Sequence, residues 1–140
     1  MLKCAYKNPM GHQLKLRVRD NSIRLRLTQT EVEQIRTEGL VRGRVPFDGP
    51  HDFEYVLESS PATVKSEAHI SNNVLIVRVP EPEIAEWSES DEVSIAANQI
   101  LEDGGELRIL VEKDFACLAP REGEDESDMY PHPMAGKESC

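Results

Sequence analysis

Four positively charged side chains near the start of the chain have a spacing that suits the binding of an anion. Apolar and charged residues alternate over residues 14–19 and 22–27, and the charged positions that concern us are Lys15, Arg17, Arg24 and Arg26. Strict alternation is typical of strands with one buried face, and Asp20-Asn21 suits a two-residue hairpin turn. The resulting register places Lys15 opposite Arg26 and Arg17 opposite Arg24 on one face of the hairpin.

Like charges directly opposite one another destabilise a sheet, so something must offset the repulsion on this face. One explanation is ion pairing with carboxylates from neighbouring strands, for which the candidates are Glu54, Glu58, Glu67 and Glu106. The other is a bound anion, such as a phosphorylated small molecule, held by bidentate arginines. The sequence leaves both explanations open.

The end of the chain contains a second set of candidate ligands. Cys117, Asp125, Asp128 and His132 combine soft and hard metal ligands, but their spacing matches no standard closed metal site. The alternative is an acidic, proline-containing tail, residues 119–140, that docks on the body of the protein with Tyr130 as its anchor.

The remaining chemistry is sparse. The nucleophile-elbow, phosphate-loop, dinucleotide-binding and zinc-protease motifs are all missing from the sequence. Glu112 and Asp114 flank the end of the last expected strand and form either a carboxylate pair or an ordinary charged strand end. We therefore expect a non-enzymatic interaction or ligand-binding module with no identified cofactor. The alternative is an anion- or metal-binding protein that uses the sites above.

The elements that must position these side chains form two similar halves. Strands are expected over residues 14–19, 22–27, 40–45, 53–58, 63–70, 74–79, 93–97 and 107–113, with helices near 30–38 and from Pro82. The first helix has a capping box at Thr30 and Glu33 and ends at Gly39.

Displacing the first half by 52 positions aligns Ile23 with Leu75, Ile35 with Trp87 and, without a gap, Val41 with Val93. This pattern predicts an internal duplication of residues 14–58 and 63–112. The expected fold is a mainly antiparallel α+β domain over residues 13–118. Its two strand-strand-helix-strand-strand halves form a closed or partly open small barrel.

Composition limits the kinds of partner and the compartment. The formal net charge of −10 argues against nucleic acid and against anionic membranes, so the expected partner is another protein or a small anion. The sequence has three cysteines and contains neither a signal peptide nor a long apolar run, which favours a cytoplasmic protein. We expect a monomer or a small homo-oligomer.

Three stretches carry a resemblance to a known group of sequences. They are KLRVRDNSIRLRLTQTEVEQ from Lys15, LRILVEKDFACLAPRE from Leu107 and DMYPHP from Asp128. Together they resemble a family of small uncharacterised bacterial proteins over residues 14–133. The resemblance implies a stand-alone domain, assigns no activity or catalytic residue, and makes the arginine hairpin and the Cys117 region family features.

Overall fold

The computed structural model describes residues 14–48, 51–115 and 128–131, and its elements follow the expected order. The strands are β1 (Lys15–Arg19), β2 (Ser22–Leu27), β3 (Leu40–Pro46), β4 (Asp52–Ser60), β5 (Glu67–Ser71), β6 (Val74–Pro80), β7 (Ser94–Ile100) and β8 (Glu106–Lys113), and the helices are α1 (Gln29–Glu38) and α2 (Glu81–Ser88). Each half of the chain has two strands, a helix and two further strands, which confirms the expected α+β class.

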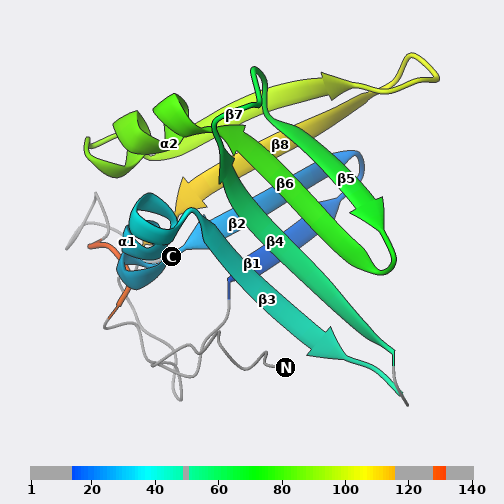
Figure 1. The fold of residues 1–140 in the computed structure, drawn as a ribbon, viewed down its shortest axis with the longest axis horizontal. Coiled ribbons are helices and arrows are strands. Elements are labelled where there is room, and N and C mark those ends of the chain that lie inside the picture. The colour runs from blue at the N-terminus through cyan, green and yellow to red at the C-terminus, as the bar shows by residue number, and fades with distance from the viewer. Residues whose placement is uncertain (1–13, 49–50, 116–127, 132–140) are drawn as a thin grey trace.

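The strands form two mixed sheets of four strands each. Sheet A has the order β1-β2-β8-β7 and sheet B the order β3-β4-β6-β5. In each sheet a hairpin from the first half lies beside a hairpin from the second half, and the central pairs, β2–β8 and β4–β6, are parallel. Figure 1 shows the two sheets crossing one over the other, with both helices on the same side of the molecule.

The expected closed barrel is wrong for the described part of the chain. Four of the six strand pairs are antiparallel, so the mainly antiparallel character is confirmed. However, each sheet is made of one hairpin from each half of the chain, and the two sheets stay separate. Closure would require ladders between β1 and β3 and between β5 and β7. At the second of these corners a side chain replaces the ladder: the Ala68 N–H donates to Gln99 Oε1 at 2.7 Å, and Gln99 Nε2 donates to the Ala68 carbonyl at 3.3 Å.

The two halves have equivalent connectivity, because replacing β1–β4 by β5–β8 converts the strand order of sheet A into that of sheet B. A displacement of 52 holds through the second helix, where Trp87 is as fully buried as Ile35. The expected match of Val41 with Val93 is wrong: Val93 is 43% exposed, whereas Ile95 is buried. Two additional residues between α2 and β7 therefore change the displacement to 54. Evolution by duplication stays a prediction.

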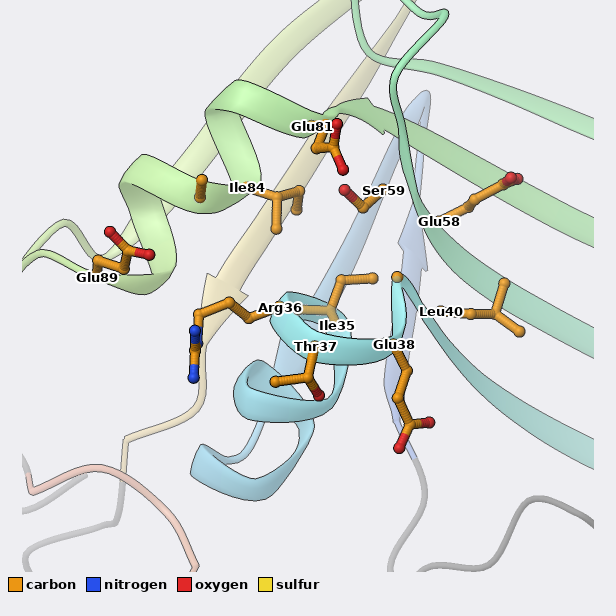
Figure 2. A pocket seen from close by; sticks show the side chains of 12 residues that line it. Ile35, Arg36, Thr37, Glu38, Leu40, Glu58, Ser59, Glu81, Ile84 and Glu89 are labelled. Carbon is orange, nitrogen blue, oxygen red and sulfur yellow. The ribbon is translucent and has the colours of Figure 1, made fainter.

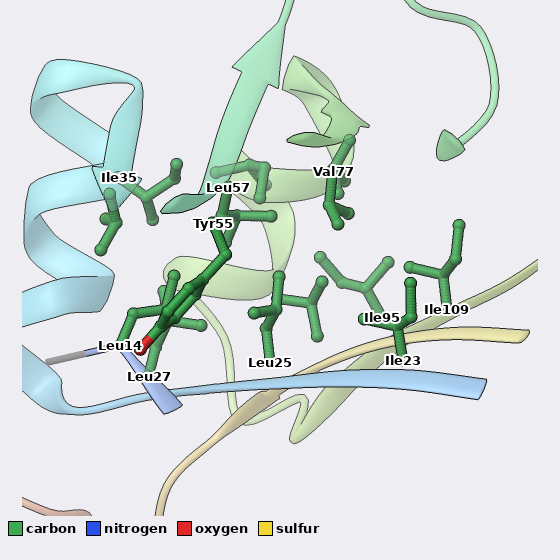
Figure 3. Close-up of a cluster of buried hydrophobic side chains, with 14 of the residues drawn as sticks. Leu14, Ile23, Leu25, Leu27, Ile35, Tyr55, Leu57, Val77, Ile95 and Ile109 are labelled. Carbon is green, nitrogen blue, oxygen red and sulfur yellow. The ribbon is translucent and has the colours of Figure 1, made fainter. Parts of the chain in front are cut away.

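One apolar core joins both sheets and both helices. Its largest buried members include Leu25, Leu57, Ile84 and Ile109, and Figure 3 shows side chains from the two sheets and α1 meeting in one cluster. Trp87 is completely buried, and its indole Nε1 donates to the Val93 carbonyl at 3.0 Å. This core fixes the outer faces of the sheets, because alternate residues of each strand must point away from it.

The N-cap of α1 lies two residues before the expected one. Thr28 is the N-cap, and the reciprocal capping bonds join Thr28 and Glu31 rather than Thr30 and Glu33. The sequence contains two overlapping Thr-x-x-Glu patterns, and the buried end of β2 at Leu27 selects the first of them. The expected end is confirmed: Gly39 has a φ of 79°, a left-handed conformation that glycine adopts without strain.

Candidate anion-binding face

The first hairpin has the predicted register. Lys15 lies opposite Arg26 and Arg17 opposite Arg24, and Asp20 adopts a positive φ of 52° in the turn. The apolar residues of β2 point into the core. The four predicted anion-binding side chains therefore share the outer face of sheet A.

Three of these four cations form ion pairs, although not with the glutamates expected from the sequence. Lys15 Nζ lies 2.8 Å from Asp114 Oδ2, and Arg24 Nε and Arg26 Nε lie 3.5 and 3.6 Å from Glu112 Oε1. The partners come from β8 and the residue after it, because β8 runs parallel to β2 and brings its end to the start of β1.

Glu112 and Asp114, which the sequence presented as a carboxylate pair or a charged strand end, thus form ion pairs with the cations of the hairpin. Asp114 is 2% exposed, and its contact with Lys15 is an ion pair rather than a well-aligned hydrogen bond. Two arginines share the single carboxylate of Glu112. Ion pairing therefore offsets only part of the repulsion on this face.

Further cations on the same face were not singled out from the sequence. Arg19 follows the alternation of β1, and Arg108 lies on β8 beside Ser22. By alternation from the buried positions, the charged outward residues of the four strands are two glutamates, Glu106 and Glu112, and six cations: Lys15, Arg17, Arg19, Arg24, Arg26 and Arg108. Within the described ranges, Arg17, Arg19 and Arg108 have no ion-pair partner.

The equivalent face of sheet B has a balanced charge. Its outward cations are Arg42, Arg44 and Arg78, and its outward carboxylates are Asp52, Glu54, Glu58 and Glu67. The three arginines pair with Glu54, Asp52 and Glu58 respectively. Because both faces belong to the same structural framework, the positive excess of sheet A is not a requirement of the fold.

The surface above the hairpin has two shallow hollows. One, of about 170 Å³, is lined by Arg17, Arg19, Ser22 and Arg24, and the other, of about 300 Å³, by Lys15, Leu16, Arg17, Arg24 and Arg26. Arg17 and Arg24 border both hollows. Guanidinium groups without a full complement of carboxylates can donate hydrogen bonds to an incoming anion.

The candidate metal site is not assembled within the described residues. Cys117, Asp125 and His132 lie outside them, and the carboxylate of Asp128 is engaged at the start of α1. It accepts hydrogen bonds from the Thr30 N–H at 3.1 Å and the Thr30 hydroxyl at 2.9 Å. In the part of the chain that the structure covers, no three histidine, cysteine or acidic residues are grouped as a metal site would require. Metal binding stays a prediction.

The described tail segment, residues 128–131, docks on the body as expected. The Tyr130 N–H donates to the Asp114 carbonyl at 2.8 Å, and the Tyr130 ring packs against the core and against Phe115. Burial, together with the charge of Asp128, raises the pKa of Tyr130 to about 12. This segment therefore lies next to Asp114, at the end of the cationic face.

A buried lysine lies behind the docked segment. Lys113 is 6% exposed, donates to the Ser90 carbonyl at 2.7 Å, and lies over the rings of Trp87 and Tyr130. Burial lowers the pKa of Lys113, and the charges of Asp91 and Glu92 oppose that effect. The amine is held by protein groups on several sides, which indicates a structural role.

Another hollow lies between the two helices, as Figure 2 shows. It has a volume of about 670 Å³ and is bordered by Glu38, Glu58, Glu81 and Glu89, with Arg36 as its one basic residue. Arg36 is already paired with Glu33. The hollow is acidic and lacks an unpaired buried polar group, so we do not assign a site to it.

Fold and face together define an α+β protein of two mixed sheets, one of which has an outer face rich in arginine. The chain belongs to the family of unknown function DUF7009, whose model matches residues 14–134. This finding confirms the expected membership of an uncharacterised family. Searches of curated proteins and of solved structures found no match. Among the described helices, none has the length and apolar character needed to cross a membrane.

Proposed function

We propose that this protein is a non-enzymatic binding module that holds an anionic partner on the outer face of sheet A. The observation that carries the proposal is the contrast between the two sheets. The outer face of sheet A has six cations against two glutamates, whereas each arginine of sheet B has its own carboxylate. Unpaired like charges on paired strands reduce stability, so their presence favours a role in binding.

The rest of the chain limits the kind of partner. With a formal net charge of −10 and a positive face, the remaining surface is more negative than the total. A long polyanion such as duplex nucleic acid would extend beyond the face and meet that negative surface. A short anionic segment or a small anion would contact the cations alone. The expectation of no nucleic acid therefore remains part of the proposal.

The proposal also keeps the expected setting of the protein. A cytoplasmic location is supported by the three cysteines of the sequence, an odd number that is a poor basis for a disulfide framework. The bacterial origin and the specific family motifs rest on the resemblance alone. We retain all three as parts of the proposal.

Thermal unfolding with two anionic probes, tripolyphosphate and a short oligoglutamate, tests the function. Binding to the folded state raises stability by about 2.7 kcal/mol at a hundredfold excess over Kd, and salt weakens this effect. The double variant Arg17→Gln/Arg19→Gln removes two cations that lack ion-pair partners within the described residues, and should abolish the stabilisation.

The matched control is Arg42→Gln/Arg44→Gln on the equivalent face of sheet B. It should lower stability slightly, because both arginines are paired, and should leave the response to the probes intact. Equal responses of the two double variants, or no stabilisation of the wild-type protein at low salt, contradict the proposed function.

A further inference from the structure

The strand that carries three of the six cations is also an edge strand. β1 is the first strand of sheet A, and among the described strands it pairs only with β2. In a hairpin with a two-residue loop, the residues flanking the loop form a hydrogen-bonded pair, and pairing alternates from there. Arg19, Arg17 and Lys15 therefore bond to β2, whereas the backbone N–H and C=O groups of Leu16 and Val18 point away from it.

These outward backbone groups are free among the described residues. No hydrogen bond joins the backbone of Leu16 or Val18 to another described residue beyond β2. The Val18 side chain is 64% exposed, and Leu16 is only half-buried. A free, partly apolar strand edge is a ready template for pairing with another strand.

The equivalent edge of sheet B lacks these features. Ala68 of β5 corresponds to Leu16, and its N–H and carbonyl are both bonded by the side chain of Gln99. The residue equivalent to Gln99 beside β1 is Val45, which has no hydrogen-bonding group. The outward side chains of β5 also include Glu67, whose charge is opposite to that of Lys15 at the equivalent position.

We infer that the partner is an extended acidic peptide segment that adds to the free edge of β1 as a fifth strand of sheet A. The inference rests on the proposed function and names its partner class. Strand addition supplies main-chain hydrogen bonds, and alternate side chains supply specificity. Residues opposite Leu16 and Val18 must be apolar, and residues opposite Lys15, Arg17 and Arg19 must be acidic.

Charge excludes the simplest competing occupant, a second copy of the chain paired through β1. An antiparallel β1–β1 pair centred on Arg17 would place the two Arg17 side chains opposite each other and Lys15 opposite Arg19. Like charges directly opposite destabilise such a pair, and cations on an edge strand are a known protection against self-pairing. An acidic strand replaces each repulsion with an attraction.

Nuclear magnetic resonance titration of the full chain tests the inference with three peptides of about eight residues, long enough for one strand. The first alternates glutamate and valine, the second has the same composition in two blocks, and the third alternates lysine and valine. The alternating acidic peptide should bind at least about tenfold more tightly than the block peptide, because only alternation matches the two faces of β1. The lysine peptide should not bind.

Hydrogen exchange at the Leu16 and Val18 amides provides the direct readout. Both amides should exchange rapidly in the free protein and at least about tenfold more slowly with the alternating acidic peptide at saturation, because ladder hydrogen bonds protect amides. The variant Val18→Pro removes one outward N–H without removing a bond to β2, and should abolish binding. Ile70→Pro, at the equivalent position of β5, is the matched control and should bind normally.

The outcomes separate this inference from the proposed function. Equal binding of the alternating and block peptides, without amide protection, overturns strand addition but leaves the anion-binding face intact. No binding of either acidic peptide at low salt overturns both. Slow exchange of these amides in the free protein also overturns strand addition, since the edge of β1 is then already occupied. Protection that is independent of protein concentration means that the same chain covers the edge. Protection that rises with concentration means that a second copy covers it. If a single-stranded oligothymidylate binds more tightly than either peptide, the peptide partner is wrong and the face binds nucleic acid instead.

Discussion

Replacing Gly43 with alanine should destabilise the protein, although alanine is the better strand residue. Gly43 lies opposite Tyr55 in the β3–β4 pair, and a Cβ added at Gly43 would lie 2.4 Å from Tyr55 Cζ. Carbon atoms in contact are normally about 3.5–4.0 Å apart, so the buried ring would have to move by about 1 Å. Overpacking of this kind costs about 1–3 kcal/mol, and the entropic gain of removing a glycine is only about 0.5–1 kcal/mol.

The net loss of about 1–2 kcal/mol corresponds to a fall in Tm of about 4–8 °C for a domain of this size. Urea unfolding with an unchanged m value would measure the same loss. The equivalent pair in sheet A is Ala97 opposite Ile109, where a methyl group faces an aliphatic side chain. Accordingly, the double variant Gly43→Ala/Tyr55→Ile should lose less unfolding free energy than the two single variants together, by about 1 kcal/mol or more. An unchanged or raised Tm for Gly43→Ala would refute this reasoning.

Three further predictions follow from the cationic face and the docked segment. Arg17→Thr should leave stability unchanged or raise it by a few tenths of a kcal/mol at low salt, since it removes a repulsion from Arg24 and no ion pair; a clear loss of urea stability would show that Arg17 is structural. Asp128→Ala should cost about 1 kcal/mol in urea unfolding by removing a cap from α1, whereas Asp128→Asn should cost less; equal costs would contradict capping. Because the pKa of Tyr130 rises from 10.0 to about 12 on folding, its contribution to stability is complete below pH 10 and is lost as the pH rises toward 12. In urea unfolding, the Tyr130→Phe variant should lose less stability over this pH range than the wild-type protein. Identical pH profiles of the two proteins would show that Tyr130 does not cause the loss.

Local pattern was enough to predict the hairpin that carries the candidate site. Alternation from Leu14 to Leu27 identifies the buried face, and a two-residue loop leaves only one register that keeps the apolar residues together. The structure has that register residue for residue. The positions of Lys15, Arg17, Arg24 and Arg26 on one outer face followed from the same argument.

The neighbours of the hairpin could not be predicted in this way. Strand β8 lies parallel to β2 although almost the whole domain separates them in sequence, and no local pattern encodes a long-range parallel pairing. The expected carboxylate partners were therefore wrong, and Glu112 and Asp114 were found only in the structure. Arg108 was visible as a charged residue between Leu107 and Ile109, but only the sheet order brings it beside the hairpin.

The barrel prediction failed for a related reason. Two similar halves are compatible either with one closed sheet or with two sheets that exchange hairpins, and the pattern of buried residues is the same in both. What decides between them is the pairing of the edge strands. At the β5–β7 corner a single glutamine side chain provides the connection, and a glutamine in a strand has no sequence signature for that role.

The comparison of equivalent positions separates residues that the fold requires from residues that it does not require. Buried positions are apolar in both halves, as with Leu25 and Val77 or Ile35 and Trp87. The outward positions differ: Arg24 corresponds to Ile76 and, with the displacement of 54, Arg108 corresponds to Glu54. Since one framework tolerates both sets, packing does not explain the arginines of sheet A, and this difference supports the proposed role in binding.

The variant Gln99→Val tests the difference between the two strand edges. It places in β7 the residue type that β3 has at the equivalent position, Val45, and it removes both hydrogen bonds to the backbone of Ala68. Two neutral hydrogen bonds contribute about 0.5–1.5 kcal/mol each, so urea stability should fall by about 1–3 kcal/mol. The Ala68 amide should then exchange as fast as those of Leu16 and Val18.

Gln99→Glu is the informative control, because a carboxylate still accepts from the Ala68 N–H but cannot donate to its carbonyl. The Ala68 amide should remain protected in this variant while part of the stability is lost. If the Ala68 amide stays protected in Gln99→Val, the glutamine does not close the edge. The contrast with β1 would then no longer support strand addition, even if the cationic face still binds anions.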